Sequence, residues 1–315
     1  MLISPSFSSA KEQKNDFFIV DSWITGFFSG LFKAKKNRFK NAWKNANKQA
    51  KNDALIWKGL FVSDTNQSNK KRTGEVLSRW TYQIPQTAVG FFTAQFYNTF
   101  LCKVDAVSHP FGSTLVTMNV PWAGVSLGSY ILTKSSAKPD PNNKLFQHEY
   151  GHYLQSKRMG FAYFVRVGIP ALMSKGIHDF HKVEVDCNRE AFSYFNHHIP
   201  DFQNDSSLTD SKGWNFDYNP FPDTLGIQIV EHKDTLTYLS YSLHQHQNEL
   251  NALKVKAKGI DYFSWILFPA PAIVGMCHAS KYNKEQLEYE EKRGFNKRII
   301  MLSPLNNMPN TQTSP

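Results

Sequence analysis

The stretch FQHEYGHYLQS, residues 146–156, constrains the fold of this chain more than any other segment. Its two histidines, His148 and His152, are four positions apart, and Glu149 directly follows the first. On an α-helix, residues i and i+4 lie on one face one turn apart, whereas residue i+1 is rotated by about 100°. The pattern therefore predicts a helix that presents two imidazoles on one face with a carboxylate beside them.

Residues on both sides of the motif indicate that it lies inside a helix. Asp140 is a typical N-cap and Pro141 a typical first helical residue. Lys157 and Arg158 suit the last turn, where they meet the negative end of the helix dipole, and Gly160 is a typical stop. We therefore expect a helix from about position 140 to position 160.

Two imidazoles one turn apart are a typical pair of zinc ligands, and this H-E-x-x-H pattern is that of zinc metallopeptidases. We expect Zn²⁺ at His148 and His152, and peptide-bond hydrolysis with Glu149 as the general base. Such a site needs a third protein ligand and one open position. The simpler alternative is two surface histidines on a helix, with Glu149 supporting a nearby lysine.

The segment HDFHKVEVDCNREAFSYF, residues 178–195, supplies the third ligand and predicts a second helix to about position 196. Glu184 begins a stripe, at offsets of three, four, seven and eleven residues, that is mostly small or apolar and so faces inward. Asp186 and Glu190 point away from this stripe. Glu184 is therefore the expected third ligand.

Other polar residues of the same segment could orient the metal ligands or replace one of them. Asn188 lies one turn beyond Glu184 and can orient a ligand histidine through a hydrogen bond. His178 and His181 remain alternative ligands, or donors to a developing oxyanion. A purely structural role for His181 is an equal alternative.

The residues before the histidine motif are predicted to form a linker, a helix, a loop and β-structure. Residues 1–22 are expected to be a disordered or linker segment, and residues 23–61 one amphipathic helix. The apolar face of that helix is expected to meet the core; it comprises Trp43, Ala46, Ala50, Ala54 and Trp57. Residues 63–74 have the composition of a loop, and residues 80–132 that of β-structure. Within them VSLGSYIL, residues 125–132, predicts a strand that pairs with substrate by β-augmentation.

The second half is predicted from patterning alone. Two apolar runs on either side of EHKD, within residues 225–243, predict a β-hairpin. Residues 245–258 are expected to form a helix ended by Gly259, and residues 284–292 a charged helix. The apolar run 262–277 contains two prolines and is short for a membrane span, so we expect it to be buried.

These elements favour an α+β fold that is zincin-like, with the active-site helix packed on a small mixed sheet and against a second, ligand-bearing helix. One domain is expected over residues 23–302, followed by a disordered tail, 303–315. Its parts are a helical segment 23–62, a metal-site core 80–200 and a C-terminal hairpin with helices 223–302.

The net charge and the cysteine content limit the kinds of partner and metal site that this chain can have. The net charge is +10, and eight lysines and arginines fall within residues 33–51. This cluster predicts a solvated helix face, with weak contact to an anionic membrane surface as the alternative and no specific nucleic-acid site. Three distant cysteines without a C-x-x-C pair exclude a thiolate zinc knuckle, and no secretory signal peptide is visible.

Two resemblances follow from these residues. The histidine pair with Glu184 resembles the gluzincin peptidases, in which a glutamate on a second helix is the third ligand; where those have an aspartate four positions later, this chain has Asn188. The stretches DPNNKLFQHEYGHYLQSKRMGFAYFVRVGIPAL and HDFHKVEVDCNREAFSYF, with WITGFFSGLF, QIPQTAVGFF and VSLGSYI before them, resemble C-terminal regions of Rhs-repeat proteins of Bacteroidetes-type bacteria. Cys187 replaces that family's usual alanine, and Ala171 its usual serine.

The second resemblance implies the variable tip of a polymorphic toxin that is exported at the end of a larger Rhs shell protein. Such a tip acts in a target cell on a protein or peptide substrate and is neutralised by a cognate immunity protein. Two alternatives stay open. One is a membrane-damaging toxin with a structural or self-processing zinc site, and the other is a non-catalytic zincin-fold binding module.

Overall fold

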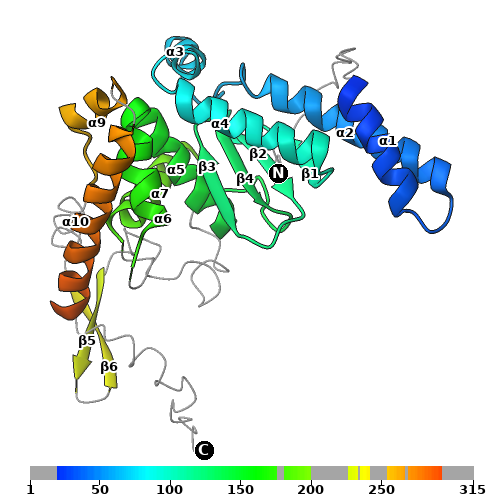
Figure 1. Ribbon diagram of the computed structural model, residues 1–315. Coiled ribbons are helices and arrows are strands. Elements are labelled where there is room, and N and C mark those ends of the chain that lie inside the picture. The colour runs from blue at the N-terminus through cyan, green and yellow to red at the C-terminus, as the bar shows by residue number, and fades with distance from the viewer. Residues whose placement is uncertain are drawn as a thin grey trace, which may run out of the picture.

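The computed structural model describes residues 20–175, 181–199, 226–232, 235–241, 254–266 and 269–292. Within them the chain is a mixed α+β structure, as predicted, with helices around a small four-stranded sheet (Figure 1). The helices are α1 (Val20–Lys33), α2 (Arg38–Lys58), α3 (Asn69–Arg79), α4 (Ile84–Gln95), α5 (Lys144–Met159), α6 (Ile169–Leu172), α7 (Lys182–His198), α9 (Gly259–Phe263) and α10 (Ala270–Lys292). The strands are β1 (Val104–Ser108), β2 (Thr114–Met118), β3 (Gly124–Leu127), β4 (Tyr130–Lys134), β5 (Gly226–His232) and β6 (Thr235–Tyr241). Short 3₁₀ or π turns are η1 (Phe96–Phe100), η2 (Pro110–Gly112), η3 (Gly160–Ala162), η4 (Phe164–Gly168) and η7 (Ser264–Ile266).

The sheet has the strand order β1-β2-β4-β3, so β3 is an edge strand. Strands β2 and β4 are parallel, whereas β3 runs antiparallel to β4. Alternate residues of β4 point to opposite faces. Leu132 packs in a cluster with Ile56 of α2 and Phe91 of α4, whereas Ile131 packs with Tyr150 of α5 and residues of α7. The sheet therefore lies between the N-terminal helices and the two helices that carry the predicted metal ligands.

The N-terminal segment is a helical hairpin, so the prediction of one helix over residues 23–61 is wrong. Asn37 adopts the left-handed conformation, with φ 51° and ψ 44°, and separates α1 from α2. The predicted apolar face is wrong for its two tryptophans, because Trp43 is 58% and Trp57 49% exposed, whereas Ala46 is fully buried as expected. Ala42 and Gln49, which were not predicted, are also fully buried. The two helix backbones approach each other through small residues, Gly26 and Gly30 of α1 against Ala46 and Ala42 of α2, and aromatic contact between the helices occurs at Trp23 and Trp43.

Two further predictions for the first half need correction. The expected loop at 63–74 becomes helical at Asn69, where α3 begins. The β-like region 80–132 contains a helix, α4, with Pro85 in its first turn, before the strands begin at Val104. The predicted strand 125–132 is a hairpin, β3 and β4, with a turn at Gly128. At φ +63° a Cβ on Gly128 would lie 2.5 Å from Thr87, so the turn requires glycine.

The predicted C-terminal hairpin is confirmed as β5 and β6, which pair antiparallel. Residues 254–258 are not helical and Gly259 begins α9 instead of ending a helix; the rest of that predicted helix, 245–253, lies outside the described residues. The predicted charged helix is the last part of α10. The expected burial of residues 262–277 is wrong, since Phe263 and Ile266 are largely exposed.

The predicted N-terminal linker ends earlier than expected, because α1 begins at Val20, and residues 1–19 and 303–315 lie outside the described residues. Among the described helices, none combines the length and the apolar composition needed to cross a membrane.

Helix α5 contains the histidine motif, as predicted, but it starts later than position 140. Asp140 closes a turn instead, in which its side chain accepts from the backbone N–H of Asn142 at 2.9 Å. Asn143 is the N-cap, and its side chain accepts from the N–H of Phe146 at 3.1 Å. The helix ends at Met159, before Gly160, as predicted.

Helix α7 crosses α5 at Gly151, the residue in the middle of the histidine motif. A Cβ at this position would lie 2.2 Å from the backbone O of Cys187 and 2.8 Å from its Sγ. Glycine therefore allows the two helix backbones to touch. Helix α7 starts at Lys182 and ends at His198, a few residues later than predicted at each end.

We predict that Gly151→Ala destabilises the protein by about 1–3 kcal/mol, because the new methyl group must push α7 away from α5. Gly74→Ala is the matched control, since Gly74 is helical and exposed, and a Cβ added there would meet no atom within 4 Å. That substitution should stabilise the protein by about 0.5–1 kcal/mol through helix propensity. Urea unfolding measures both values, and equal effects at the two positions would contradict the close crossing.

Candidate metal centre

Helices α5 and α7 bring three of the predicted residues together. The Nε2 atoms of His148 and His152 lie 3.2 Å and 3.1 Å from Oε2 of Glu184. The two imidazole rings are edge to face, with centroids 4.9 Å apart. Glu184 is fully buried and His152 is 8% exposed. The sequence-based choice of Glu184 as the third group beside the histidines is therefore supported by its position.

This group fits a metal ion by its spacing and its chemistry. With Cys187 it forms a cluster whose ligand atoms all lie within 4.8 Å of one another and which could hold a metal ion. Tetrahedral ligands at about 2.0–2.1 Å from a metal are about 3.3 Å apart. The measured 3.1 Å and 3.2 Å are close to this value. Two imidazole nitrogens and one carboxylate are also a common ligand set for divalent metals.

Each imidazole is oriented by an amide on its other nitrogen. Nδ1 of His148 lies 2.9 Å from Oδ1 of Asn188, as predicted, and Nδ1 of His152 lies 2.8 Å from Oε1 of Gln155. The Gln155 amide is itself fixed, because its Nε2 donates to the carbonyl of Val183 and to Asp186, both at 2.9 Å. Each Nδ1 thus donates to an amide oxygen, which turns Nε2 of the same ring towards Glu184.

Gln155 is a residue that sequence reasoning missed. Its position three residues after His152 places it on the same face of α5, so helical spacing would have been the signal. Asp186 points away from the histidines, as predicted, but it is buried and holds Gln155. Arg158 and Arg189 form ion pairs with Asp186 in turn. The support of His152 therefore extends through three layers of polar contacts.

Glu149 lies beside the histidine pair and against the edge strand. The hydroxyl of Ser126 on β3 donates to Oε2 of Glu149 at 2.8 Å and lies 2.7 Å from its backbone carbonyl. A Cβ on Gly124 would come within 2.5 Å of Oε1 of the same carboxylate, so glycine makes room for it. Strand β3 therefore fixes where the Glu149 carboxylate points.

A pocket of about 240 Å³ opens in front of these groups. Residues 124–127 of β3 form one wall, and His148, Glu149, His152 and Glu184 face into it. The rest of the lining forms a mostly apolar wall that comes from Tyr163, η4 and α6; it includes Phe164, Val167, Ile169 and Leu172. A ligand in this pocket would contact the candidate metal ligands and the edge strand together.

The remaining predicted residues lie elsewhere. His181 is fully buried at the N-cap of α7 and packs against Tyr282, with ring centroids 6.1 Å apart. It does not line the pocket, which favours the structural alternative for this residue. His178 lies outside the described residues. Cys187 donates from its Sγ to the backbone carbonyl of His148 at 3.0 Å and lies 3.8 Å from Nδ1 of the same residue.

The three central groups alter one another's protonation. Burial lowers the pKa values of His148 and His152, but Cys187 and Glu184 outweigh it and raise both well above the ordinary value. Burial raises the pKa of Glu184, yet the two imidazoles lower it well below its ordinary value. These directions favour an ion-paired group without metal, in which a bound cation would replace protons.

Comparisons of the chain with protein-family models, with curated proteins and with solved structures found no match. The function is therefore inferred from the geometry of the site.

We predict that Gln155→Met weakens metal binding about 10–100-fold, because His152 loses the acceptor that orients it. Gln147→Met is the matched control, since Gln147 is buried on the same helix and forms no hydrogen bond with the candidate ligands in the described part of the chain. Competition with a fluorescent chelator gives both affinities. If the two variants bind metal equally well, Gln155 does not support the site.

We also predict that metal uptake releases protons at neutral pH. The histidine pKa values are raised in the metal-free protein, so the imidazoles carry protons that a metal must displace. Affinity should therefore rise as the pH rises from about 6 to 8. Calorimetric titrations in buffers with different ionisation enthalpies measure the protons released. An uptake that releases none would contradict the assignment of these histidines.

Proposed function

We propose that this protein is a zinc-dependent peptidase in which His148, His152 and Glu184 hold the metal and Glu149 is the general base. The observation that carries the proposal is the position of Glu149. It lies beside the two imidazoles on α5, faces the same pocket, and is fixed by Ser126 on the edge strand. A purely structural metal site has no need of a carboxylate held next to its ligands and open to a pocket.

In the proposed hydrolysis, zinc and the residues of the chain have different roles. Zinc, when bound, lowers the pKa of a water towards about 7 and polarises a carbonyl group. Glu149 accepts the proton of the attacking water and passes it to the nitrogen of the leaving amine. A carbon–oxygen bond forms and the carbon–nitrogen bond breaks, so one water is consumed for each peptide bond. Asn188 and Gln155 keep the two imidazoles in the required orientation.

Strand β3 and the apolar wall suit a peptide substrate. As an edge strand, β3 pairs with a neighbouring strand on one side only, and the hydroxyl of Tyr163 donates to the carbonyl of Ser126 on this strand at 2.9 Å. The remaining backbone groups of its open edge would pair with an extended peptide, which would add to the sheet as a further strand. The wall formed by residues such as Phe164 and Val167 would take an apolar side chain of that peptide. An edge strand beside the metal-binding helix is the arrangement of zincin peptidases, and we propose a zincin-like fold on this basis.

Cys187 supports a second candidate, a closed structural site. Its Sγ belongs to the metal-binding cluster, and a fourth protein ligand would leave no position open for water. Two contacts favour the open site. The thiol donates to the carbonyl of His148, and it lies near Nδ1 of that ring, whereas Glu184 contacts Nε2. Cys187 thus acts as a packing residue at the crossing of α5 and α7.

We further propose, from the resemblance to Rhs-repeat proteins, that the peptidase is a toxin delivered into a competing cell as the tip of a larger protein. Its partners would be the Rhs shell and a cognate immunity protein. The proposal of a toxin depends on the sequence resemblance alone. One set of variants therefore tests both activities, with peptide cleavage and bacterial growth measured separately.

We predict that Glu149→Gln lowers peptidase activity about 10²–10⁴-fold, because the general base is lost. Zinc content and thermal stability should stay unchanged, since Glu149 is not a ligand. Cleavage of a fluorescent peptide library by the purified chain measures the activity, and growth of a bacterial cell that expresses the chain measures toxicity. His148→Ala, which removes a ligand, is the comparison variant and should lose zinc as well.

Peptide cleavage and bacterial growth separate the proposal of a peptidase from the proposal of a toxin. Loss of cleavage with loss of toxicity supports both the peptidase and the toxin. Loss of cleavage with unchanged toxicity would leave the peptidase standing and refute it as the toxic activity. Full cleavage by a zinc-loaded Glu149→Gln chain would refute the assigned mechanism.

A further inference from the structure

The helical hairpin formed by α1 and α2 has an unusual distribution of side chains. Its interior is made of small and polar residues: a Cβ at Gly26 would lie 3.0 Å from Cα of Ala46, and one at Gly30 would lie 2.7 Å from Cα of Ala42. Ser22, also buried, forms a hydrogen bond with Thr99 of η1 at 2.7 Å. Close packing through small residues brings the two backbones together and leaves the large side chains on the outside.

The outer surface of the hairpin carries large exposed apolar side chains. Phe32 at the end of α1 is 81% exposed, and Phe39 at the start of α2 is 75% exposed. The rings on this surface contact one another, with centroids 6.4 Å apart for Phe28 and Phe32 and 5.2 Å apart for Trp23 and Trp43. Further exposed apolar residues of the hairpin are Val20, Ile24, Phe28 and Trp43. A soluble two-helix hairpin would normally bury such residues between its helices.

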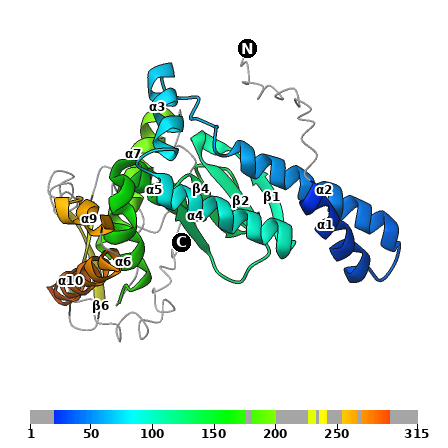
Figure 2. The same ribbon diagram turned by 45° about the horizontal axis from the view of Figure 1, so that its top comes forward.

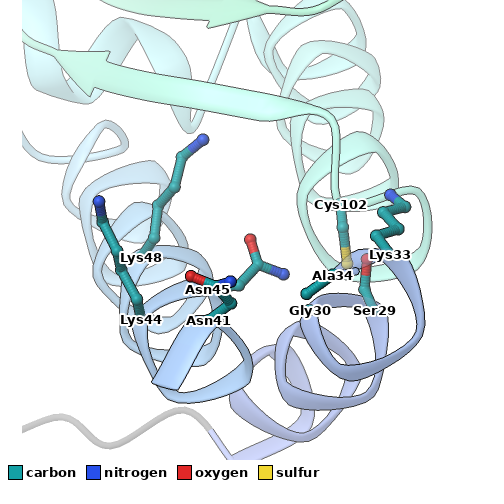
Figure 3. A pocket seen from close by; sticks show the side chains of 9 residues that line it. All are labelled: Ser29, Gly30, Lys33, Ala34, Asn41, Lys44, Asn45, Lys48 and Cys102. Carbon is teal, nitrogen blue, oxygen red and sulfur yellow. The ribbon is translucent and has the colours of Figure 1, made fainter. Parts of the chain in front are cut away.

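The same hairpin carries only positive charge between Asp21 and Asp53, because the residues between them include no acidic one. The tip has the sequence FKAKKNRFK, residues 32–40, in which the two exposed phenylalanines flank a basic loop. On one flank, side chains from α1 and α2 line a pocket of about 350 Å³ (Figure 3). Lys33, Lys44 and Lys48 stand around this pocket, together with Asn41 and Asn45. Lys48 also pairs with Asp105 at 3.1 Å.

We propose that the tip of this hairpin, residues 32–40, docks on the surface of an anionic lipid bilayer. Phe32 and Phe39 would enter the boundary between headgroups and acyl chains, and the lysines around them would contact lipid phosphates. Helix α1 has 14 residues, about 21 Å in length, so it is too short to span the hydrocarbon core and lies at its surface. The charge of the tip is complementary to anionic lipid.

Two other occupants fit the surface less well. A second copy of the chain would bring two basic tips together, which like-charge repulsion opposes. A nucleic-acid duplex would match the lysines but would place Phe32 and Phe39 against its charged backbone. A bilayer is the partner that covers the apolar side chains and neutralises the basic ones.

Exposed phenylalanines also occur on α4 and η1, next to the hairpin. Phe92 of α4 and Phe96 and Phe100 of η1 follow at intervals of four residues and are all exposed. Element η1 contacts α1 through Thr99. Figures 1 and 2 show the hairpin projecting at the end of the molecule away from α7, so the proposed docking does not involve the metal centre.

Flotation of the full chain with lipid vesicles tests this proposal. We expect binding to vesicles of phosphatidylcholine with one-quarter phosphatidylglycerol, and little binding to phosphatidylcholine alone. The double variants Phe32→Ser with Phe39→Ser, and Lys35→Glu with Lys36→Glu, should each weaken binding about tenfold or more. Two matched variants should bind like the wild type: Ile266→Ser, which removes an exposed apolar residue, and Lys281→Glu with Lys284→Glu, which reverses two exposed charges on α10.

The outcomes separate the possible occupants. Equal binding by the tip variants and the wild type would overturn the proposal, as would failure of the wild type to float. A concentration-dependent dimer that the phenylalanine variants abolish, without vesicle binding, would assign the surface to a second copy. Displacement from vesicles by a DNA duplex at matched ionic strength, with tighter binding to the duplex, would assign it to nucleic acid. Each of these last two results also overturns the lipid proposal. Glu149→Gln should float like the wild type whether or not the chain is a peptidase.

Discussion

The contact between Gly151 of α5 and Cys187 of α7 determines the geometry of the metal centre. Without a side chain at position 151, the two helix backbones touch, and a Cβ there would overlap the carbonyl of Cys187. Glu184 lies three residues before Cys187 on α7, so this crossing carries its carboxylate between the two imidazoles. A wider crossing would move Glu184 out of reach of His148 and His152.

A fully buried carboxylate is costly unless charges or hydrogen bonds compensate it. Here the compensation for Glu184 comes from two imidazoles whose pKa values are raised. A divalent cation would supply the same compensation with more positive charge at one point. Without metal the cluster therefore favours an ion-paired state, and a metal can take the place of its protons. The amides of Asn188 and Gln155 act in both states, because they contact the nitrogens that face away from Glu184.

The local parts of this site could be predicted from the sequence, and the tertiary parts could not. Helical spacing placed His148 and His152 on one face and selected Glu184 from the second helix. Gln155 was missed although it obeys the same spacing, because its role depends on the partners Val183 and Asp186 that hold its amide. Ser126 was missed because it meets Glu149 only through the position of β3 on the sheet edge.

The wrong predictions for the N-terminal hairpin have a common physical origin. The prediction of a single N-terminal helix extended the apolar periodicity of residues 43–57 back to position 23. It crossed residues 34–37, where Asn37 turns into the left-handed region without any proline or glycine to mark it. The same reasoning assigned Trp43 to the core, because aromatic residues usually lie inside. In this hairpin the helix backbones approach each other through glycine and alanine, so Trp43 packs on Trp23 at the surface and stays more than half exposed. Hydrophobic patterning identifies an apolar face but does not say what covers it.

The central claim is that two imidazoles and Glu184 bind zinc while Cys187 does not. X-ray absorption at the zinc edge on the zinc-loaded chain tests this most directly, because nitrogen and oxygen ligands lie at about 2.0–2.1 Å and sulfur at about 2.3 Å. We predict a first shell of nitrogen and oxygen only, with two imidazoles, that is unchanged in Cys187→Ala. A sulfur shell in the wild-type spectrum that disappears in Cys187→Ala would contradict the claim and make the site a closed, structural one.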